Sequence, residues 1–183
     1  MELVRGTLGR RVLRWVQSQG KVLCHDTAEQ QRLSVLLDEL RPIFPEMEQV
    51  HGWFVYRQQD QPPNLRGDDA ETWRDVTLDG SGVLFAIGIS VDGLDTGHDY
   101  AVLLILHELC HVLDSGNHDW HYHSALSGLI DRYNEATGRS VRNDFFGLEM
   151  RYDSRPVPES WFAPQPAKKA PEGRQFRTEA VDP

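Results

Sequence analysis

The spacing of apolar residues predicts two helices in the N-terminal part of the chain. Residues 5 to 17 form a short basic helix with its apolar side chains on one side, and residues 26 to 40 form a longer amphipathic helix. Thr27 suits the N-cap of the longer helix, and Pro42 ends it. The apolar positions are Leu8, Val12, Trp15 and Val16 in the first helix and Leu33, Leu36, Leu37 and Leu40 in the second.

Two later segments have the residue pattern of β-strands. Residues 51 to 58 (HGWFVYRQ) are rich in aromatic and β-branched residues. Residues 83 to 91 (VLFAIGISV) alternate between large apolar side chains and mostly small ones, which predicts a strand with one large apolar face. The intervening residues 60 to 71 contain the proline, glycine, asparagine and aspartate residues that are typical of a loop.

A nearly uniform apolar segment predicts the most buried helix of the chain. After a turn over residues 92 to 99, in which Asp99 suits a helix cap, residues 100 to 113 are apolar except at three positions. A further amphipathic helix is predicted over residues 119 to 136 and ends at Gly138. The three polar positions of the apolar helix are His107, Glu108 and His111.

Composition and cysteine content limit the classes of protein to which the chain can belong. It has 39% apolar and 26% charged residues, as globular domains do, and no apolar run approaches the roughly 18 residues of a membrane helix. Arginines interrupt the N-terminal stretch where a secretory signal needs an apolar segment. Two cysteines, Cys24 and Cys110, are too few for a disulfide framework. We expect a cytoplasmic protein that does not act at a membrane.

Acidic residues give the chain a net charge of -9 and gather in its middle. No lysine or arginine occurs between Arg74 and Arg132, whereas acidic residues recur throughout that stretch. An acidic surface repels phosphate groups, so we expect no direct binding of nucleic acid. Solvated loops would also account for these acids.

The segment HELCH carries the H-E-x-x-H motif of metal-dependent hydrolases. Residues four apart on a helix lie above one another, so His107 and His111 present their imidazoles to one point. Glu108 lies too far round the helix to bind the same metal ion comfortably, but it can reach an adjacent water molecule as a general base. Polar groups buried without partners each cost a few kcal/mol, which a metal ion would offset. The alternative is a set of surface or hydrogen-bonded histidines.

A catalytic zinc ion usually takes three protein ligands and leaves its fourth position to water. His118, His121 and His123 all follow the break after the helix and compete for the third position, whereas His98 precedes the helix. His118 lies where a side chain can point back at the metal, and His121 lies one turn further on the same face. Helix geometry alone therefore leaves these two open. We expect His123 to face another side and to be either exposed or structural.

These residues resemble the SprT-like (Spartan-type) zinc metalloproteases, in which H-E-x-x-H is followed by a loop and an H-G-x-x-F-type segment, here HDWHY. The resemblance covers about residues 30 to 135. It implies an α+β fold with a minimal zincin-like core, in which a small, mostly antiparallel or mixed sheet packs against the H-E-x-x-H helix. It also implies that His118 is the third zinc ligand and that Tyr122 packs under the site. Asp119 replaces the usual glycine and a zinc ribbon is lacking, which tells against the DNA-associated roles of that family.

The sequence thus predicts zinc-dependent hydrolysis of peptide bonds, with Glu108 as the general base that accepts a proton from the metal-activated water. Candidate donors to the developing oxyanion are His121, Tyr100, Tyr122 and Tyr152. We expect the strand over residues 83 to 91 to lie beside the cleft, where an extended peptide would add as a further strand. The surrounding acids predict a preference for basic protein or peptide substrates.

Three segments are expected along the chain. Residues 1–25 form a basic helical segment, residues 26–155 form the zincin-like metallopeptidase domain, and residues 156–183 form a proline-rich tail that we expect to be disordered. The alternative function is a non-catalytic metal-binding or protein-interaction module on the same scaffold. Glu108 argues against it, because a purely structural metal site has no use for that carboxylate.

Overall fold

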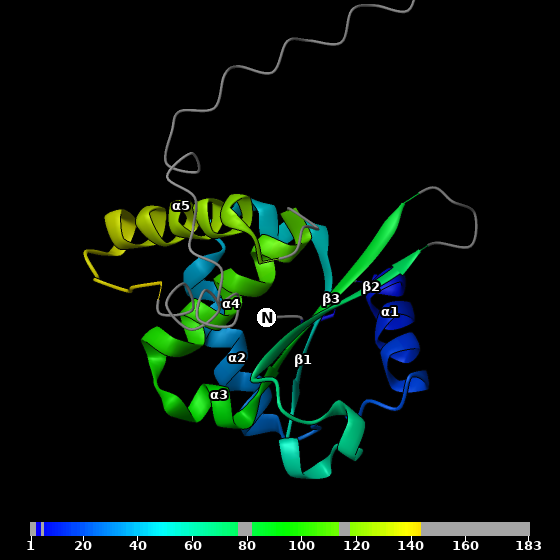
Figure 1. The fold of residues 1–183 in the computed structure, drawn as a ribbon. Helices are drawn as coiled ribbons and strands as arrows, with labels where there is room; N and C mark the ends of the chain where they lie inside the picture. Colours follow the sequence, from blue (N-terminus) through cyan, green and yellow to red (C-terminus); the bar gives the residue numbers. More distant parts are fainter. Residues whose placement is uncertain (1–2, 5, 77–81, 114–117, 144–183) are drawn as a thin grey trace, which may run out of the picture.

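The computed structural model describes residues 3–4, 6–76, 82–113 and 118–143, which form a mixed α+β protein (Figure 1). This part of the chain contains five α-helices and a three-stranded mixed sheet, which confirms the predicted α+β class. None of the described helices is both long and apolar enough to cross a membrane. The predicted tail over residues 156–183 lies outside the described residues. The helices are α1 (Gly6–Ser18), α2 (Thr27–Leu40), α3 (Val91–Thr96), α4 (His98–Leu113) and α5 (Trp120–Thr137), and the strands are β1 (Val50–Tyr56), β2 (Ala70–Val76) and β3 (Val83–Ser90).

The sheet has β3 at its centre, with β1 on one side and β2 on the other. β1 runs parallel to β3, whereas β2 runs antiparallel to it. The pairs between β2 and β3 extend from Ala70 with Ile89 to Val76 with Val83. Both sides of β3 are therefore occupied by neighbouring strands, and β1 and β2 form the edges of the sheet.

The edge strand β2 begins inside the segment that the sequence predicts as a loop. The loop predicted over residues 60 to 71 ends earlier, because Ala70 and Glu71 already pair with β3. Polar side chains of this strand have partners that are distant in the sequence: Thr72 contacts α4, and Glu71 forms an ion pair with Lys21. A local pattern of apolar residues does not reveal such partners, which explains why the strand was missed.

Helices cover both faces of the sheet, as Figure 1 shows. The large apolar face of β3, with Ile87 and Ile89 fully buried, packs in one core with α2, α4 and α5. α1 covers the opposite face, where its buried valines pack with Phe54 and neighbouring residues in a second core. A Cβ atom at Gly88 would come within 2.4 Å of the Phe54 ring. The small residues on this face of β3 therefore make room for Phe54 and for α1.

The starts of two helices differ from the predicted caps. The N-cap of α2 is Asp26 and not Thr27, because the Asp26 carboxylate accepts a hydrogen bond at 2.9 Å from the backbone N–H two residues further on. The same carboxylate also forms an ion pair with Arg57 at 3.2 Å. A threonine side chain carries no charge and could not form this ion pair. α4 begins at His98, so Asp99 lies within the first turn of the helix.

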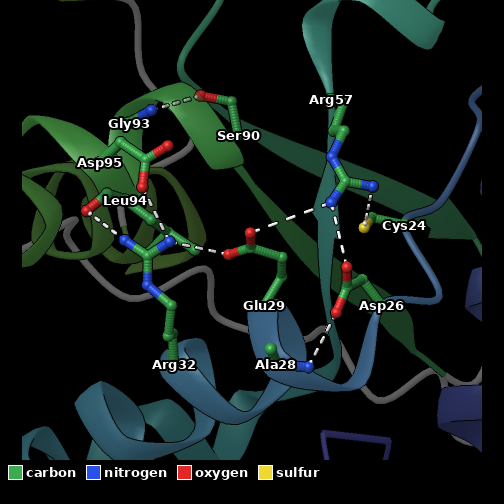
Figure 2. A network of polar contacts seen from close by, with 10 residues as sticks. All are labelled: Cys24, Asp26, Ala28, Glu29, Arg32, Arg57, Ser90, Gly93, Leu94 and Asp95. Atoms are coloured by element: carbon green, nitrogen blue, oxygen red, sulfur yellow. Dashed lines mark hydrogen bonds and ion pairs between the residues drawn. The ribbon is translucent and has the colours of Figure 1, made fainter.

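Polar contacts join α2 to the end of β1 and to α3 (Figure 2). α3 occupies much of the predicted turn over residues 92 to 99, and the Ser90 side chain caps it. Arg32 lies 2.8 Å from the carboxylate of Asp95 and donates to the carbonyl oxygen of Leu94 at 3.0 Å. Exposed ion pairs of this kind contribute at most about 1 kcal/mol each, so Asp95 takes part in an ordinary surface network. Further contacts of the network join Arg57 to Cys24, Asp26 and Glu29, and Glu29 in turn to Arg32.

Close packing of α1 on β1 predicts a large difference between two glycine substitutions. A Cβ atom at Gly9 would lie 2.3 Å from the carbonyl oxygen of His51, whereas one at Gly128, in α5, would meet no atom within 4 Å apart from the nearby backbone of its own helix. We expect Gly9→Ala to lower the free energy of unfolding by about 2 to 3 kcal/mol. Gly128→Ala should raise it by about 0.5 to 1 kcal/mol, because alanine favours a helix interior. Urea unfolding of both variants tests this, and an undiminished stability of Gly9→Ala would contradict the packing of α1.

Candidate metal centre

α4 carries the H-E-x-x-H motif inside the protein, where it packs with β2, β3 and α5. His107 and Glu108 are 8% and 4% exposed, and His111 is partly buried. The ring centroids of the two histidines lie 5.0 Å apart. The spacing of four residues therefore places both imidazoles on the same side of the helix, as the sequence predicts.

His118 completes a group of three imidazoles. Its Nε2 atom lies 3.1 Å from Nε2 of His107 and 2.9 Å from Nε2 of His111, and the three candidate ligand atoms all lie within 4.8 Å of one another. A tetrahedral zinc ion with bonds of about 2.05 Å holds its ligand nitrogens about 3.3 Å apart. The two distances that involve His118 are therefore close to the separation of ligand nitrogens at a tetrahedral zinc ion.

The cap of α5 explains why His118 and not His121 joins the group. The side chain of Asp119 accepts hydrogen bonds from the backbone N–H groups of His121 and Tyr122 at 2.9 and 3.1 Å. Helix α5 therefore starts after His118, whose side chain reaches back to α4. His121 lies in the first helical turn, where it is exposed and outside the group of three. It is also not among the residues that line the pocket at the three histidines.

The two remaining histidines near the motif lie outside the group. His123 is only 2% exposed, which excludes the exposed position considered for it, and its ring centroid lies 6.4 Å from that of His118. His98 lies in the first turn of α4 with its Nε2 atom 2.8 Å from a carboxylate oxygen of Glu39 on α2. Among the described residues, the group of His, Cys, Asp and Glu side chains able to hold a metal ion consists of His107, His111 and His118.

Tyr122 packs against all three imidazoles and is fully buried. Its ring centroid lies 4.6 Å from that of His111, 4.7 Å from that of His118 and 5.3 Å from that of His107. Its hydroxyl donates to the carbonyl oxygen of His107 at 2.9 Å. Tyr122 therefore supports the histidines from below, and its hydroxyl is engaged with the backbone of α4.

Tyr100, which was also considered as an oxyanion donor, does not line the pocket at the histidines. Its hydroxyl donates to the carboxylate of Asp69 at 3.0 Å. Tyr152 lies outside the described residues.

The carboxylate of Glu108 has a defined position beside the histidines. Thr72 on β2 donates to its Oε2 atom at 2.8 Å and lies 3.1 Å from the carbonyl oxygen of the same residue. The other oxygen, Oε1, lies 3.9 Å from Nε2 of His107. Thr72 is a residue of the site that the sequence pattern missed. The alternation of polar and β-forming residues in ETWRDV was the available indication.

Burial shifts the pKa values of Glu108 and His107 in opposite directions. Desolvation raises the pKa of Glu108 to about 8, with nearby Glu71 and Asp68 acting in the same direction and the Thr72 hydrogen bond opposing it. Desolvation lowers the pKa of His107 to about 3, and the neighbouring histidines add to this. His107 is therefore neutral at pH 7 and offers the lone pair that a metal ion requires.

The three histidines and Glu108 line a pocket of about 440 Å³ together with residues of β2 and with Phe85 of β3. Its position corrects the prediction that a peptide adds to the strand over residues 83 to 91. That strand, β3, lies between β1 and β2 and has no open side. Within the described part of the chain, β2 pairs only with β3, so β2 is the strand with an edge available at the pocket.

The geometry thus brings three imidazoles and the buried carboxyl group of Glu108 together at a pocket beside a sheet edge. Comparison of the chain with protein-family models, with curated proteins and with solved structures finds no match.

Proposed function

We propose that the chain is a zinc-dependent metallopeptidase with a zincin-like core. The observation that carries this proposal is the convergence of the Nε2 atoms of His107, His111 and His118, with the buried carboxylate of Glu108 beside them. The pocket leaves this group accessible from the side of β2. A binding site without catalytic function would not need a buried carboxylate at that position, where it costs folding free energy.

The donor set suits zinc better than the harder divalent ions. Imidazole nitrogen is a good ligand for zinc, whereas magnesium and calcium prefer oxygen ligands. Three protein ligands with one open position are typical of catalytic zinc. A bound zinc ion would polarise a peptide carbonyl and lower the pKa of a water molecule in its open position.

Residues of the chain would move the proton during hydrolysis. Glu108, whose Oε1 atom faces His107, would accept a proton from the attacking water as the water oxygen bonds to the carbonyl carbon. The same carboxyl group would donate this proton to the peptide nitrogen as the C–N bond breaks, which yields a carboxyl group and an amine. The raised pKa of Glu108 favours its holding the proton between the two transfers.

The edge of β2 would bind the substrate. An extended peptide can add to a sheet edge through main-chain hydrogen bonds, and β2 has such an edge beside the histidines. Asp68 and Glu71 bring negative charge to the pocket, whereas Arg74 brings one positive charge. Glu71 is already paired with Lys21, so the exposed Asp68 is the main acidic group that a substrate would meet. We propose a preference for basic peptides that is carried by Asp68 and is partly offset by Arg74.

Cleavage of fluorogenic peptides tests the proposal. The zinc-loaded protein should cleave lysine-rich peptides several-fold faster than glutamate-rich ones, and 1,10-phenanthroline should stop the reaction until zinc is restored. Cleavage of neither set at full zinc loading would leave the non-catalytic metal-binding or interaction module as the better interpretation. Equal cleavage of both sets would contradict only the preference for basic peptides.

A further inference from the structure

We propose that Thr72 is a positioning residue that holds the general base with one oxygen turned toward the histidines. This inference rests on the proposed function, because it concerns the role of Glu108 in hydrolysis. The hydroxyl of Thr72 lies 2.8 Å from Oε2 of Glu108 and 3.1 Å from the carbonyl oxygen of that residue. One side chain of β2 is thus bound to both the side chain and the backbone of the general base.

The hydrogen bond from Thr72 gives the two carboxylate oxygens of Glu108 different roles. Oε2 accepts from Thr72, and Oε1 is then directed to the site, where it lies 3.9 Å from Nε2 of His107. A glutamate side chain has three rotatable bonds, so without a fixed partner its oxygens exchange places and directions. With Oε2 held, Oε1 is the oxygen that would meet the proton of the attacking water.

The sheet fixes the position of the threonine hydroxyl. Thr72 is paired with Ile87 in the register between β2 and β3, and a β-branched residue has a restricted χ1 angle. The neighbours of Thr72 in the strand turn to other partners: Glu71 pairs with Lys21, and Trp73 packs edge-on against Trp15 of α1 with ring centroids 5.8 Å apart. Because neighbouring side chains along a strand point to opposite faces, the side chain of Thr72 points toward α4.

Two substitutions separate the hydroxyl from the shape of the side chain. Thr72→Val keeps the shape and removes the hydroxyl, so we expect kcat to fall about 10- to 100-fold because the base is misdirected. We expect KM to change less than about twofold and the zinc content to stay the same, because valine leaves the main chain of β2, which would bind the peptide, and the three histidines unchanged. Thr72→Ser should restore most of the rate.

Thr96→Val provides the matched control. The hydroxyl of Thr96 donates to the carbonyl oxygen of Asp92 at 3.0 Å on the exposed side of α3, away from the pocket. Loss of that hydroxyl should leave kcat unchanged. An equal loss of rate in the two valine variants, or a serine variant that stays as slow as Thr72→Val, would overturn the positioning role.

Stability of the metal-free protein gives a readout that does not depend on activity. If Thr72 bonds the Glu108 side chain, Thr72→Val should destabilise the wild-type chain more than it destabilises Glu108→Ala, because part of its partner is already missing there. Strictly additive effects on the unfolding midpoint in urea would overturn the proposed bond. In the wild type and in Glu108→Ala alike, Thr72 can still donate to the backbone carbonyl oxygen of residue 108. The effects of the two substitutions on stability should therefore be only partly coupled.

The outcomes distinguish this inference from the proposed function. A wild-type protein that hydrolyses no peptide at full zinc loading overturns both, because there is then no general base to position. An active wild type with an inactive Glu108→Gln variant and a fully active Thr72→Val variant overturns only the inference on Thr72. An active wild type with a slow Thr72→Val and a rescued Thr72→Ser supports it.

Discussion

Glutamine in place of Glu108 is expected to lower kcat for peptide hydrolysis by about a thousandfold while leaving zinc content unchanged. Glutamine has nearly the same shape and keeps an oxygen that can accept the hydrogen bond from Thr72, but it cannot accept the proton of the attacking water. The loss should appear in kcat and in kcat/KM alike, because the interaction is made in the transition state. Steady-state kinetics on a fluorogenic peptide, with zinc measured on the same samples, checks this result.

The stability of the same variant shows whether it is correctly folded. In the unfolded chain Glu108 ionises above its ordinary pKa of 4.5, whereas in the folded metal-free chain burial raises its pKa to about 8. The folded state therefore binds more protons between these two values, so the free energy of unfolding falls as the pH rises from about 4.5 to about 8. A glutamine at position 108 does not ionise, so the free energy of unfolding of Glu108→Gln lacks this decrease with pH.

We accordingly expect metal-free Glu108→Gln to be as stable as the wild type near pH 4 and more stable at pH 8, by roughly 2 to 4 kcal/mol. A variant that lost activity through misfolding would instead be less stable at every pH. Undiminished hydrolysis by the well-folded variant would mean that another group acts as the base.

The sequence predicted best those features that depend on local spacing. The positions of His107 and His111 follow from the helical repeat alone, because the apolar residues around them leave one helical interpretation for α4. The amphipathic patterns of α2 and α5 were equally informative, although the cap of α2 lies one residue before the predicted one. Each of these features is decided within about one or two helical turns.

Features that depend on side-chain hydrogen bonds were not available from the pattern of apolar residues. β2 carries few apolar residues because Glu71 and Thr72 face polar groups of Lys21 and Glu108, which are far away in the sequence. The choice between His118 and His121 required the start of α5, and that start depends on the hydrogen bonds of the Asp119 side chain. In both cases side-chain hydrogen bonds, and not hydrophobic periodicity, determined the local structure.

The second core explains why one face of β3 carries mostly small residues. Phe54 and α1 occupy the face of β3 that carries mostly small residues. The pocket lies at α4, which packs in the core on the other side of the sheet. The basic residues of α1 are therefore separated from the histidines by the sheet itself (Figure 1).

Replacement of His118 or His121 by alanine should show most clearly which of these two histidines binds zinc. We expect about one zinc ion per chain in the wild type and in His121→Ala, and a zinc affinity at least about a hundredfold lower in His118→Ala, because only the latter loses one of the three converging nitrogens. Both side chains are exposed, so neither change should disturb the core.

The two variants can be compared by elemental mass spectrometry and by thermal unfolding with and without zinc. Zinc at about a hundred times its dissociation constant stabilises a folded protein by roughly 2.7 kcal/mol, so the wild type and His121→Ala should unfold at a higher temperature with zinc, and His118→Ala should not. Loss of zinc only in His121→Ala would transfer the third ligand to that residue. A wild type that takes up no zinc would leave Glu108 without a metal centre to serve, and the proposal of a metallopeptidase would fall with it.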